Sequence, residues 1–361
     1  MNPARQLQRR GAKPETRGAF LFRSLAAALV WCYALAVMGW FLGYLVSGDR
    51  LWPWAVLNSF PALLFLPVPV ILALAAIARR RGVWAAAAVP VILWLALFGW
   101  RYLPRMAGAA ATGAELRVMA FNVLVTNANA DAVADAIAAG QPDLIAFAEL
   151  STAMNAKLAQ RLAADYPYRT LHRLPGANFG SGIYSRWPLD DLGSLKTGLG
   201  LRSAAADVHT PEGTLRFVAL HPRSTWLDTS SLDAAETSIE ENFRGREAQL
   251  AAVCRHVETW GDRPVILAGD LNASEFSDAY RCVADRLIDT YREVGRGTGH
   301  TWPARQTGHI RSRWLYVLSP LTRIDYVFHS RHWAGVDARV LTMPTGSDHR
   351  PIVAILRWTD E

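Results

Sequence analysis

The sequence predicts a layered α/β or α+β domain of about 250 residues that follows three membrane-spanning helices. Long apolar stretches occupy the N-terminal third of the chain, and from Leu116 onward short β-rich runs alternate with amphipathic helical segments. The hydrophobic fraction of 51% excludes a disordered chain. Three cysteines among 361 residues are too few for a disulfide-stapled scaffold.

Charge is divided unevenly along the chain. Residues 1–114 hold 12 Lys and Arg against 2 Asp and Glu, whereas residues 115–361 hold 26 against 29. The formal net charge of +7 therefore comes from basic residues that flank the apolar stretches. This pattern indicates membrane topology, and it disfavours a strong nucleic-acid binder because the second part is almost neutral.

Each apolar stretch is close to the ~20 residues that a helix needs to cross a bilayer. The stretches are residues 24–46, 54–77 and 83–100. They predict a transmembrane region of three helices within residues 24–103, and the prolines of the second stretch are tolerated inside a membrane. A signal peptide or a buried helical hairpin is the alternative. A signal peptide is disfavoured because its apolar region would be shorter and followed closely by a cleavage site.

The orientation follows from the positive charges in the short segments between the stretches. Lys and Arg are frequent in the tail of residues 1–23 and in the loop of Arg79–Arg81, and such loops stay in the cytoplasm. Three crossings then place the linker of residues 104–114 and the domain of residues 115–361 outside. We therefore expect a multi-pass protein of the plasma (inner) membrane with an extracytoplasmic domain.

The second part is read as strands separated by helices. Asp131–Ala139 is expected to be a helix that Gly140 ends, and Ser151 or Thr152 is expected to cap a helix that reaches Ala164. A polar stretch over residues 224–244 is expected to be a surface loop before a helix at residues 247–260. The expected strands are residues 116–123, 143–147, 182–185, 203–208, 214–221, 264–268, 324–329 and 352–357.

Polar side chains occur at the ends of these apolar runs, where active sites are usually built. A single carboxylate in such a place is usually a cap or a turn. Six such places in one domain, all mixing Asn, Asp, Glu and His, are harder to explain in that way. They are Asn122, Glu149, His221, Asp270 with Asn272, Asp325, and Asp348 with His349.

Two segments are the most specific, Gly269–Ser274 (GDLNAS) and Gly346–Pro351 (GSDHRP). Together with the other polar positions, in this order, they make residues 116–358 similar to the endonuclease/exonuclease/phosphatase family. The resemblance implies an α+β four-layer sandwich, in which two packed β-sheets are flanked by helices and the strand ends meet at one cleft. It also implies a metal-dependent hydrolase of phosphate ester or anhydride bonds.

The resemblance implies a role for each polar position. Glu149, helped by Asn122, would hold a divalent cation, and Asp348 would lie beside it or beside a second one. Oxygen ligands without thiolates favour Mg²⁺ or Mn²⁺.

The proton chemistry would belong to the remaining residues. His349, oriented by Asp325, would take the proton of the attacking water. Asp270 would position the nucleophile, Asn272 would donate a hydrogen bond to the phosphate, and a protonated His221 would stabilise charge on its oxygens.

Several positions keep a second interpretation. Asp325 could pair with Arg323 instead of His349. Trp302 is a candidate for substrate binding, although a packed aromatic residue is an equal alternative. Arg223 could meet phosphate or only water.

The cysteines of the second part allow two states. A disulfide between Cys254 and Cys282 is permitted outside the cytoplasm. Cys254 lies on the apolar stripe of its expected helix, which favours a buried free thiol.

A catalytic domain tethered outside a membrane would meet lipid-linked phosphates at a high effective concentration. We therefore expect a membrane-anchored phosphoesterase that acts on a lipid-linked phosphate or diphosphate, with membrane lipids as its partners. This architecture is similar to that of bacterial membrane proteins of the same family that are associated with glycopeptide (teicoplanin) resistance. The alternatives are a tethered nuclease acting on DNA or RNA and a non-catalytic sensor of phosphorylated ligands. The oligomeric state is not predicted.

Overall fold

The computed structural model describes residues 16–103, 113–225, 230–304 and 319–359. The expected linker of residues 104–114 lies almost wholly outside the described residues. The chain divides into two compact units. The first comprises Met1–Phe41 with Phe65–Leu95, and the second comprises Leu42–Leu64 with Ala96–Glu361.

The first unit consists of apolar helices. They are α1 (Arg17–Ser47, most of it in this unit), α3 (Val68–Ala78) and α4 (Arg81–Leu97). Small side chains such as Ala27, Ala34, Ala75 and Ala87 form the contacts between these helices. Small residues let helix backbones approach closely, which is how helices associate in a membrane.

Within the part of the chain that the structure describes, two helical segments are long and apolar enough to cross a membrane, Arg17–Ser47 and Pro61–Ala78. The helix Arg81–Leu97 is apolar but has only 17 residues. The expected second stretch, residues 54–77, is divided. Its start forms the short helix α2 (Trp52–Ser59) of the second unit, because Pro61 disfavours helical geometry at the residue before it. The 3₁₀ turn η1 (Pro61–Phe65) then leads into α3.

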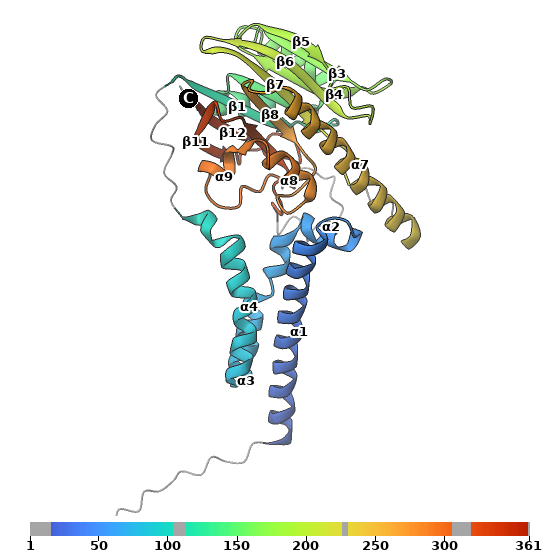
Figure 1. The fold of residues 1–361 in the computed structure, drawn as a ribbon, viewed down its shortest axis with the longest axis vertical. Helices are drawn as coiled ribbons and strands as arrows, with labels where there is room; N and C mark the ends of the chain where they lie inside the picture. Colours follow the sequence, from blue (N-terminus) through green and yellow to red (C-terminus); the bar gives the residue numbers. More distant parts are fainter. Residues whose placement is uncertain (1–15, 104–112, 226–229, 305–318, 360–361) are drawn as a thin grey trace, which may run out of the picture. The chain divides into compact units, whose positions relative to one another are not determined.

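The second unit contains two six-stranded sheets (Figure 1). The first has the order β11-β12-β1-β2-β4-β3 and the second the order β5-β6-β7-β8-β10-β9. The strands of the first sheet are β1 (Glu115–Asn122), β2 (Leu144–Ser151), β3 (Tyr168–Arg173), β4 (Phe179–Ser185), β11 (Trp333–Val340) and β12 (Ile352–Trp358). The strands of the second are β5 (Leu189–Gly193), β6 (Arg202–Thr210), β7 (Gly213–His221), β8 (Val265–Asp270), β9 (Ile288–Asp289) and β10 (Asp325–His329).

Alternating side chains build the layers. In β1, Val118 and Ala120 face the core between the two sheets. Met119 and Phe121 point to the opposite face, where they pack with α5 (Ala130–Gly140) and α6 (Thr152–Arg161). Successive strand residues point to opposite faces, so β1 serves two cores at once.

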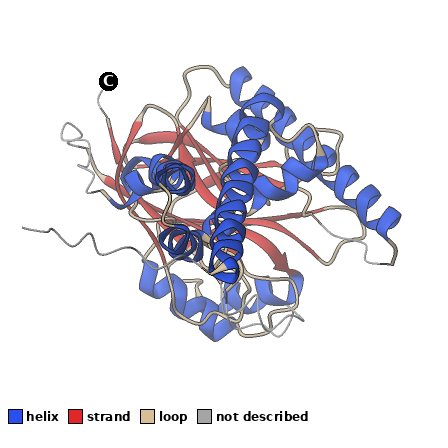
Figure 2. Ribbon diagram, turned by 90° about the horizontal axis from the view of Figure 1, so that it is seen from below, coloured by secondary structure: helices blue, strands red, loops and turns tan. Residues whose placement is uncertain are grey.

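The second sheet follows the same rule. Phe217 and Ala219 of β7 face the first sheet, whereas Val218 and Leu220 pack with α7 (Leu232–Thr259) and α8 (Asp278–Ala284). In Figure 2 the strands of the two sheets are drawn in red and the helices in blue. The fold is therefore a helix–sheet–sheet–helix α+β sandwich, as expected.

Two parallel strand pairs fix where the site is built. β1 pairs with β2 after the crossover helix α5, and β7 pairs with β8 after α7. The carboxyl ends of parallel neighbours meet at the same edge of a sheet. Asn122, Glu149, His221 and Asp270 lie at or near these ends.

Some local expectations were wrong. Most of the expected surface loop at residues 224–244 is helical, because α7 already begins at Leu232 and the hydroxyl of Ser231 caps it by accepting from Ala234 N. The expected free thiol at Cys254 is also wrong. Cys254 and Cys282 form a disulfide between α7 and α8, with Cα atoms 6.3 Å apart.

Candidate active site

The polar strand ends of both sheets converge on one cluster. Asn122 and Glu149 come from the first sheet, and Asp270, Asp325 and His221 come from the second. All except Glu149 are buried, and 21% of the Glu149 side chain is exposed. The sandwich therefore assembles one site from residues that lie far apart in the sequence.

The Asn122 amide lies at the centre of this cluster. Its Nδ2 donates to Glu149 Oε1 at 3.2 Å and to Asp270 Oδ2 at 2.9 Å, and it lies 3.4 Å from His349 Nε2. Its Oδ1 accepts from Leu124 N at 3.0 Å, which fixes the orientation of the amide. Asn122 therefore presents its nitrogen to the carboxylates and orients Glu149.

Glu149 projects from an irregular position of β2. The pairing of β2 with β4 shifts register between Phe147 and Leu150, and Glu149 has a positive φ of 53°. A non-glycine residue in this left-handed conformation is strained, and such strain is concentrated at functional sites. The bulge turns the carboxylate toward the cluster, where Val125 N donates to Oε2 at 3.0 Å.

Asp270 ends β8 beside a glycine that no other residue could replace without strain. Gly269 has φ +138°, and a Cβ there would lie 2.1 Å from the carbonyl oxygen of Leu220. The close approach of β7 and β8 brings His221 Nε2 within 3.8 Å of Asp270 Oδ2. Asp270 Oδ1 accepts from Asn272 N at 2.7 Å, which holds the turn after the strand.

His349 is held from both sides. Its Nδ1 lies 2.9 Å from Asp325 Oδ2, and its Nε2 lies 3.7 Å from Asp270 Oδ2. Ser347 Oγ accepts from His349 N at 3.0 Å and donates to the Asn122 carbonyl at 2.6 Å. The expected Asp325–His349 pair is therefore present. The alternative partner of Asp325 is excluded because Arg323 binds Asp289 and Glu275.

Burial and neighbouring charges shift the pKa values of Asp270 and His349. Burial raises the pKa of Asp270 to about 7. Burial alone would lower the pKa of His349, but Asp325 and Asp270 outweigh it and raise that pKa well above its usual range. At neutral pH His349 is therefore protonated, and Asp270 is close to the midpoint of its titration.

His221 differs from the imidazolium that the sequence analysis considered. Burial lowers the pKa of His221 to about 4, although Glu149 opposes this shift. His221 is therefore neutral at pH 7. Both of its ring nitrogens are buried without a hydrogen-bond partner, and Nε2 lies 3.7 Å from Glu149 Oε1. An unpaired buried donor beside a carboxylate fits a site that receives another polar group.

Three predicted residues have other contacts in the structure. The Asp348 carboxylate accepts from Trp302 Nε1 at 3.2 Å, so this indole is a partner of Asp348. The side-chain amide of Asn272 donates to the Pro222 carbonyl at 3.2 Å. Arg223 is exposed and its backbone N–H donates to Gln249.

Two arginines and one serine of the site were not predicted from the sequence. Arg202 is the sheet partner of His221, and its charge acts on Glu149. Arg246 is buried and donates to the Asn272 carbonyl at 2.6 Å. Ser347, described above, lies inside a motif that was recognised only for its neighbours. Arg246 was not singled out because it lies between the expected surface loop of residues 224–244 and the expected helix of residues 247–260.

The chemistry of the site fits a divalent cation. Ligand atoms of Asp270, Asp325 and His349 all lie within 4.8 Å of one another, and Glu149 shares the Asn122 amide with Asp270. Asp325 Oδ1 is buried without a partner. A set of carboxylate oxygens and an imidazole without thiolates suits a hard or borderline cation.

An α+β two-sheet sandwich whose strand ends gather carboxylate, amide and imidazole groups defines a class of phosphate-processing hydrolases. A sequence profile of the Endonuclease/Exonuclease/phosphatase family matches residues 119–349. The chain therefore belongs to this family, whose members are hydrolases that generally use a divalent metal. A search of curated proteins gave no match to the sequence.

Solved structures share the fold. They include an endonuclease/exonuclease/phosphatase from Beutenbergia cavernae, which is 24% identical and has a TM-score of 0.50 over 68% of this chain and 72% of that one. A family protein from Bacteroides thetaiotaomicron is 17% identical, with a TM-score of 0.50 over 69% and 99%. Truncated TDP2 from Caenorhabditis elegans is also 17% identical, with a TM-score of 0.51 over 67% and 98%. At these identities the similarity shows the fold alone.

Proposed function

We propose that the protein is a membrane-anchored phosphoesterase that uses Mg²⁺ or Mn²⁺ to hydrolyse a lipid-linked phosphate or diphosphate. The proposal of hydrolysis rests on the buried Asp325–His349–Asp270 arrangement beside Glu149. This arrangement joins a proton-carrying imidazole to carboxylates at one edge of the sandwich.

Each side chain then has a proposed task. Glu149 and Asp270 supply oxygen ligands, and Asn122 orients both carboxylates. A bound divalent cation would polarise a phosphoryl oxygen and lower the pKa values of neighbouring acids. Protonated His349 can donate a proton to the leaving group, and once a bound cation has lowered its pKa it can accept one from the attacking water; Asp325 orients its ring. Neutral His221 offers a hydrogen bond to a phosphoryl oxygen.

Two features support an extracytoplasmic location. The disulfide between Cys254 and Cys282 is typical of an oxidising compartment. Residues 42–64 and 96–103 both belong to the unit that contains the catalytic domain. Two crossings, by Pro61–Ala78 and Arg81–Leu97, would be consistent with this division of the chain. Arg79–Arg81 would then lie in the cytoplasm, in agreement with the positive-inside rule.

The lipid-linked substrate is supported by a contact beside the site. The rings of Trp302 and Phe60 lie 6.3 Å apart, and Trp302 donates to Asp348, the neighbour of His349. Phe60 directly precedes the apolar segment that begins at Pro61. A phosphate that is anchored in the bilayer would therefore be presented near the site at a high effective concentration.

The test compares substrates with the full chain in detergent micelles. Phosphate release from an isoprenoid diphosphate should exceed the nicking of plasmid DNA, and His349→Ala should lower both activities by about 10²- to 10⁴-fold. Activity should be lost in EDTA and restored by Mg²⁺ or Mn²⁺. Faster nicking of DNA would favour a tethered nuclease, and full activity in EDTA would exclude the metal-dependent mechanism.

A further inference from the structure

The loop after β8 carries catalytic groups and also contacts the segments that flank the apolar helices. We define the catalytic loop as residues 270–278. We propose that the flanking segments, residues 48–60 and 98–103, position this loop, with Asn58 and Arg101 as positioning residues. The inference rests on the proposed function and adds residues from the membrane region to the same site.

The first flanking segment is joined to the end of the catalytic loop. Asp49 N donates to Asp278 Oδ2 at 2.9 Å, and Asp278 N donates to Asp49 Oδ2 at 3.0 Å. Asn58 is fully buried and donates to Asp49 Oδ1 at 2.8 Å. Its backbone carbonyl accepts from the Ser274 hydroxyl. Buried polar groups with this many partners have one defined geometry.

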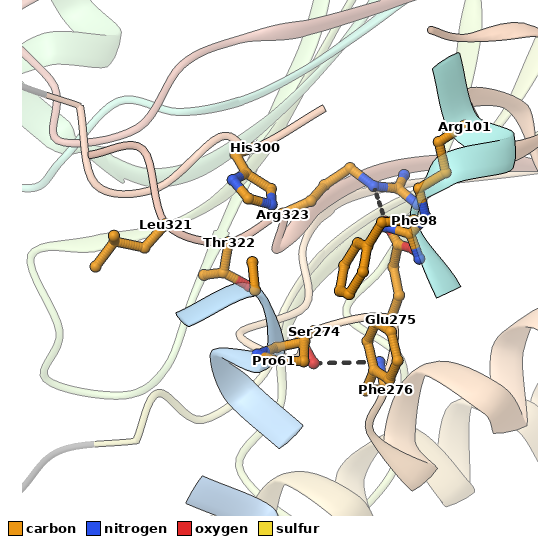
Figure 3. Close-up of a pocket in the computed structure, with 11 residues that line it drawn as sticks. Pro61, Phe98, Arg101, Ser274, Glu275, Phe276, His300, Leu321, Thr322 and Arg323 are labelled. Carbon is orange, nitrogen blue, oxygen red and sulfur yellow. Dashed lines mark hydrogen bonds and ion pairs between the residues drawn. The ribbon is translucent and has the colours of Figure 1, made fainter. Parts of the chain in front are cut away.

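The second flanking segment contributes Arg101, which lies in η2 (Gly99–Tyr102). Its guanidinium binds Glu275 at 2.9 Å, and the two side chains are only 7% and 8% exposed. The same guanidinium lies 4.7 Å above the ring of Phe98 and 5.7 Å from that of Phe276. Figure 3 shows Phe98 and Arg101 beside Glu275 and Phe276.

Glu275 also connects the catalytic loop to strand β10, which begins with Asp325. Its Oε1 accepts from Arg323 Nε at 2.7 Å, and Arg323 lies two residues before Asp325. Leu271 N donates to the Ile324 carbonyl at 2.8 Å, so the loop and the start of β10 are also joined by their backbones. A displacement of Glu275 would therefore move both sides of the Asp325–His349–Asp270 arrangement.

The cavity at this junction is too small to be a second ligand site. It has a volume of about 20 Å³ and is lined by Ser274, Glu275, His300 and Arg323, among others (Figure 3). Such a space holds about one water molecule. Buried ion pairs add little net stability, because desolvation offsets their attraction, but they can select one geometry. The junction therefore suits a positioning role.

Arg101→Gln in the full chain tests the inference. Glu275 keeps two arginine partners in this variant, so the fold should persist. With the soluble substrate bis(4-nitrophenyl) phosphate, kcat should fall about 10- to 100-fold while KM changes less than about twofold. Hydrogen–deuterium exchange of residues 270–278 should accelerate. Arg101→Lys, which retains the charge, should recover part of both properties.

Arg161→Gln is the matched control, because Arg161 forms an exposed ion pair with Asp131. It should change neither kcat nor exchange in the catalytic loop. If Arg101→Gln lowers only the melting temperature and leaves kcat and loop exchange unchanged, the positioning role is wrong. If the wild-type chain hydrolyses neither bis(4-nitrophenyl) phosphate nor an isoprenoid diphosphate, the proposed function fails, and the exchange measurement still decides the positioning role.

Discussion

Replacement of His349 by alanine gives the most direct test of the proposed chemistry. The imidazole is 5% exposed and bridges Asp325 and Asp270, so no solvent group can replace it at once. Loss of a positioned acid or base lowers turnover by about 10²- to 10⁴-fold. At about 1.4 kcal/mol for each factor of ten, this equals roughly 3–5 kcal/mol of transition-state stabilisation.

His349→Ala should also lower the stability of the fold, so the assay has to separate lost catalysis from unfolding. Asp325 Oδ2 loses its partner, and leaving a buried carboxylate unpaired costs about 3–5 kcal/mol of stability. Phosphate release should therefore be measured at a temperature at which near-ultraviolet circular dichroism shows a folded variant. His209→Ala is the control, since His209 pairs with Asp190 at the surface. A folded His349→Ala protein with more than half of the wild-type turnover would refute the assigned role.

Two further predictions concern stability. Burial would raise the pKa of Glu275, but its three arginine partners outweigh burial and hold the pKa well below its usual range. Its ion pairs therefore contribute stability above about pH 4.3, and this contribution is lost as the pH falls through the folded-state pKa. Glu275→Gln should melt at a lower temperature than the wild type, and this difference should be largest at neutral pH. It should narrow below about pH 4. A difference that does not change with pH would contradict the prediction. The Cys254–Cys282 disulfide closes a separation of 28 residues, which corresponds to about 3–4 kcal/mol. Cys282→Ser should lower the melting temperature, and equal values under reducing and non-reducing conditions for the wild type would count against the bond.

The sequence predicted which polar residues cluster, because strand ends leave a local signature. Asp270 and His349 follow or precede apolar runs within unusual short motifs, so their convergence could be inferred from the resemblance. The layered sandwich followed from alternating runs such as Leu116–Asn122, which serve two cores. The clustering of these residues and the layered fold therefore follow from local hydrophobic patterns in the sequence and from the order of the strands.

Other features depend on tertiary contacts that leave no local pattern. The orientation of the Asn122 amide is set by Leu124 N, and the neutral state of His221 is set by burial. Arg101 looked like a residue at a membrane boundary, yet it binds Glu275 from a position 174 residues earlier in the chain. A hydropathy pattern cannot show that a residue at the end of a membrane-spanning segment belongs to the second unit of the chain.

The contact at Gly269 limits how this enzyme could change its specificity. The missing β-carbon lets the backbone of β8 touch that of β7, so the distance between the ends of these two strands is fixed. Any side chain at this position would separate His221 from Asp270 before it altered contacts with substrate. For the proposed function, differences in substrate size would therefore be accommodated by the surrounding loops and not by the ends of β7 and β8.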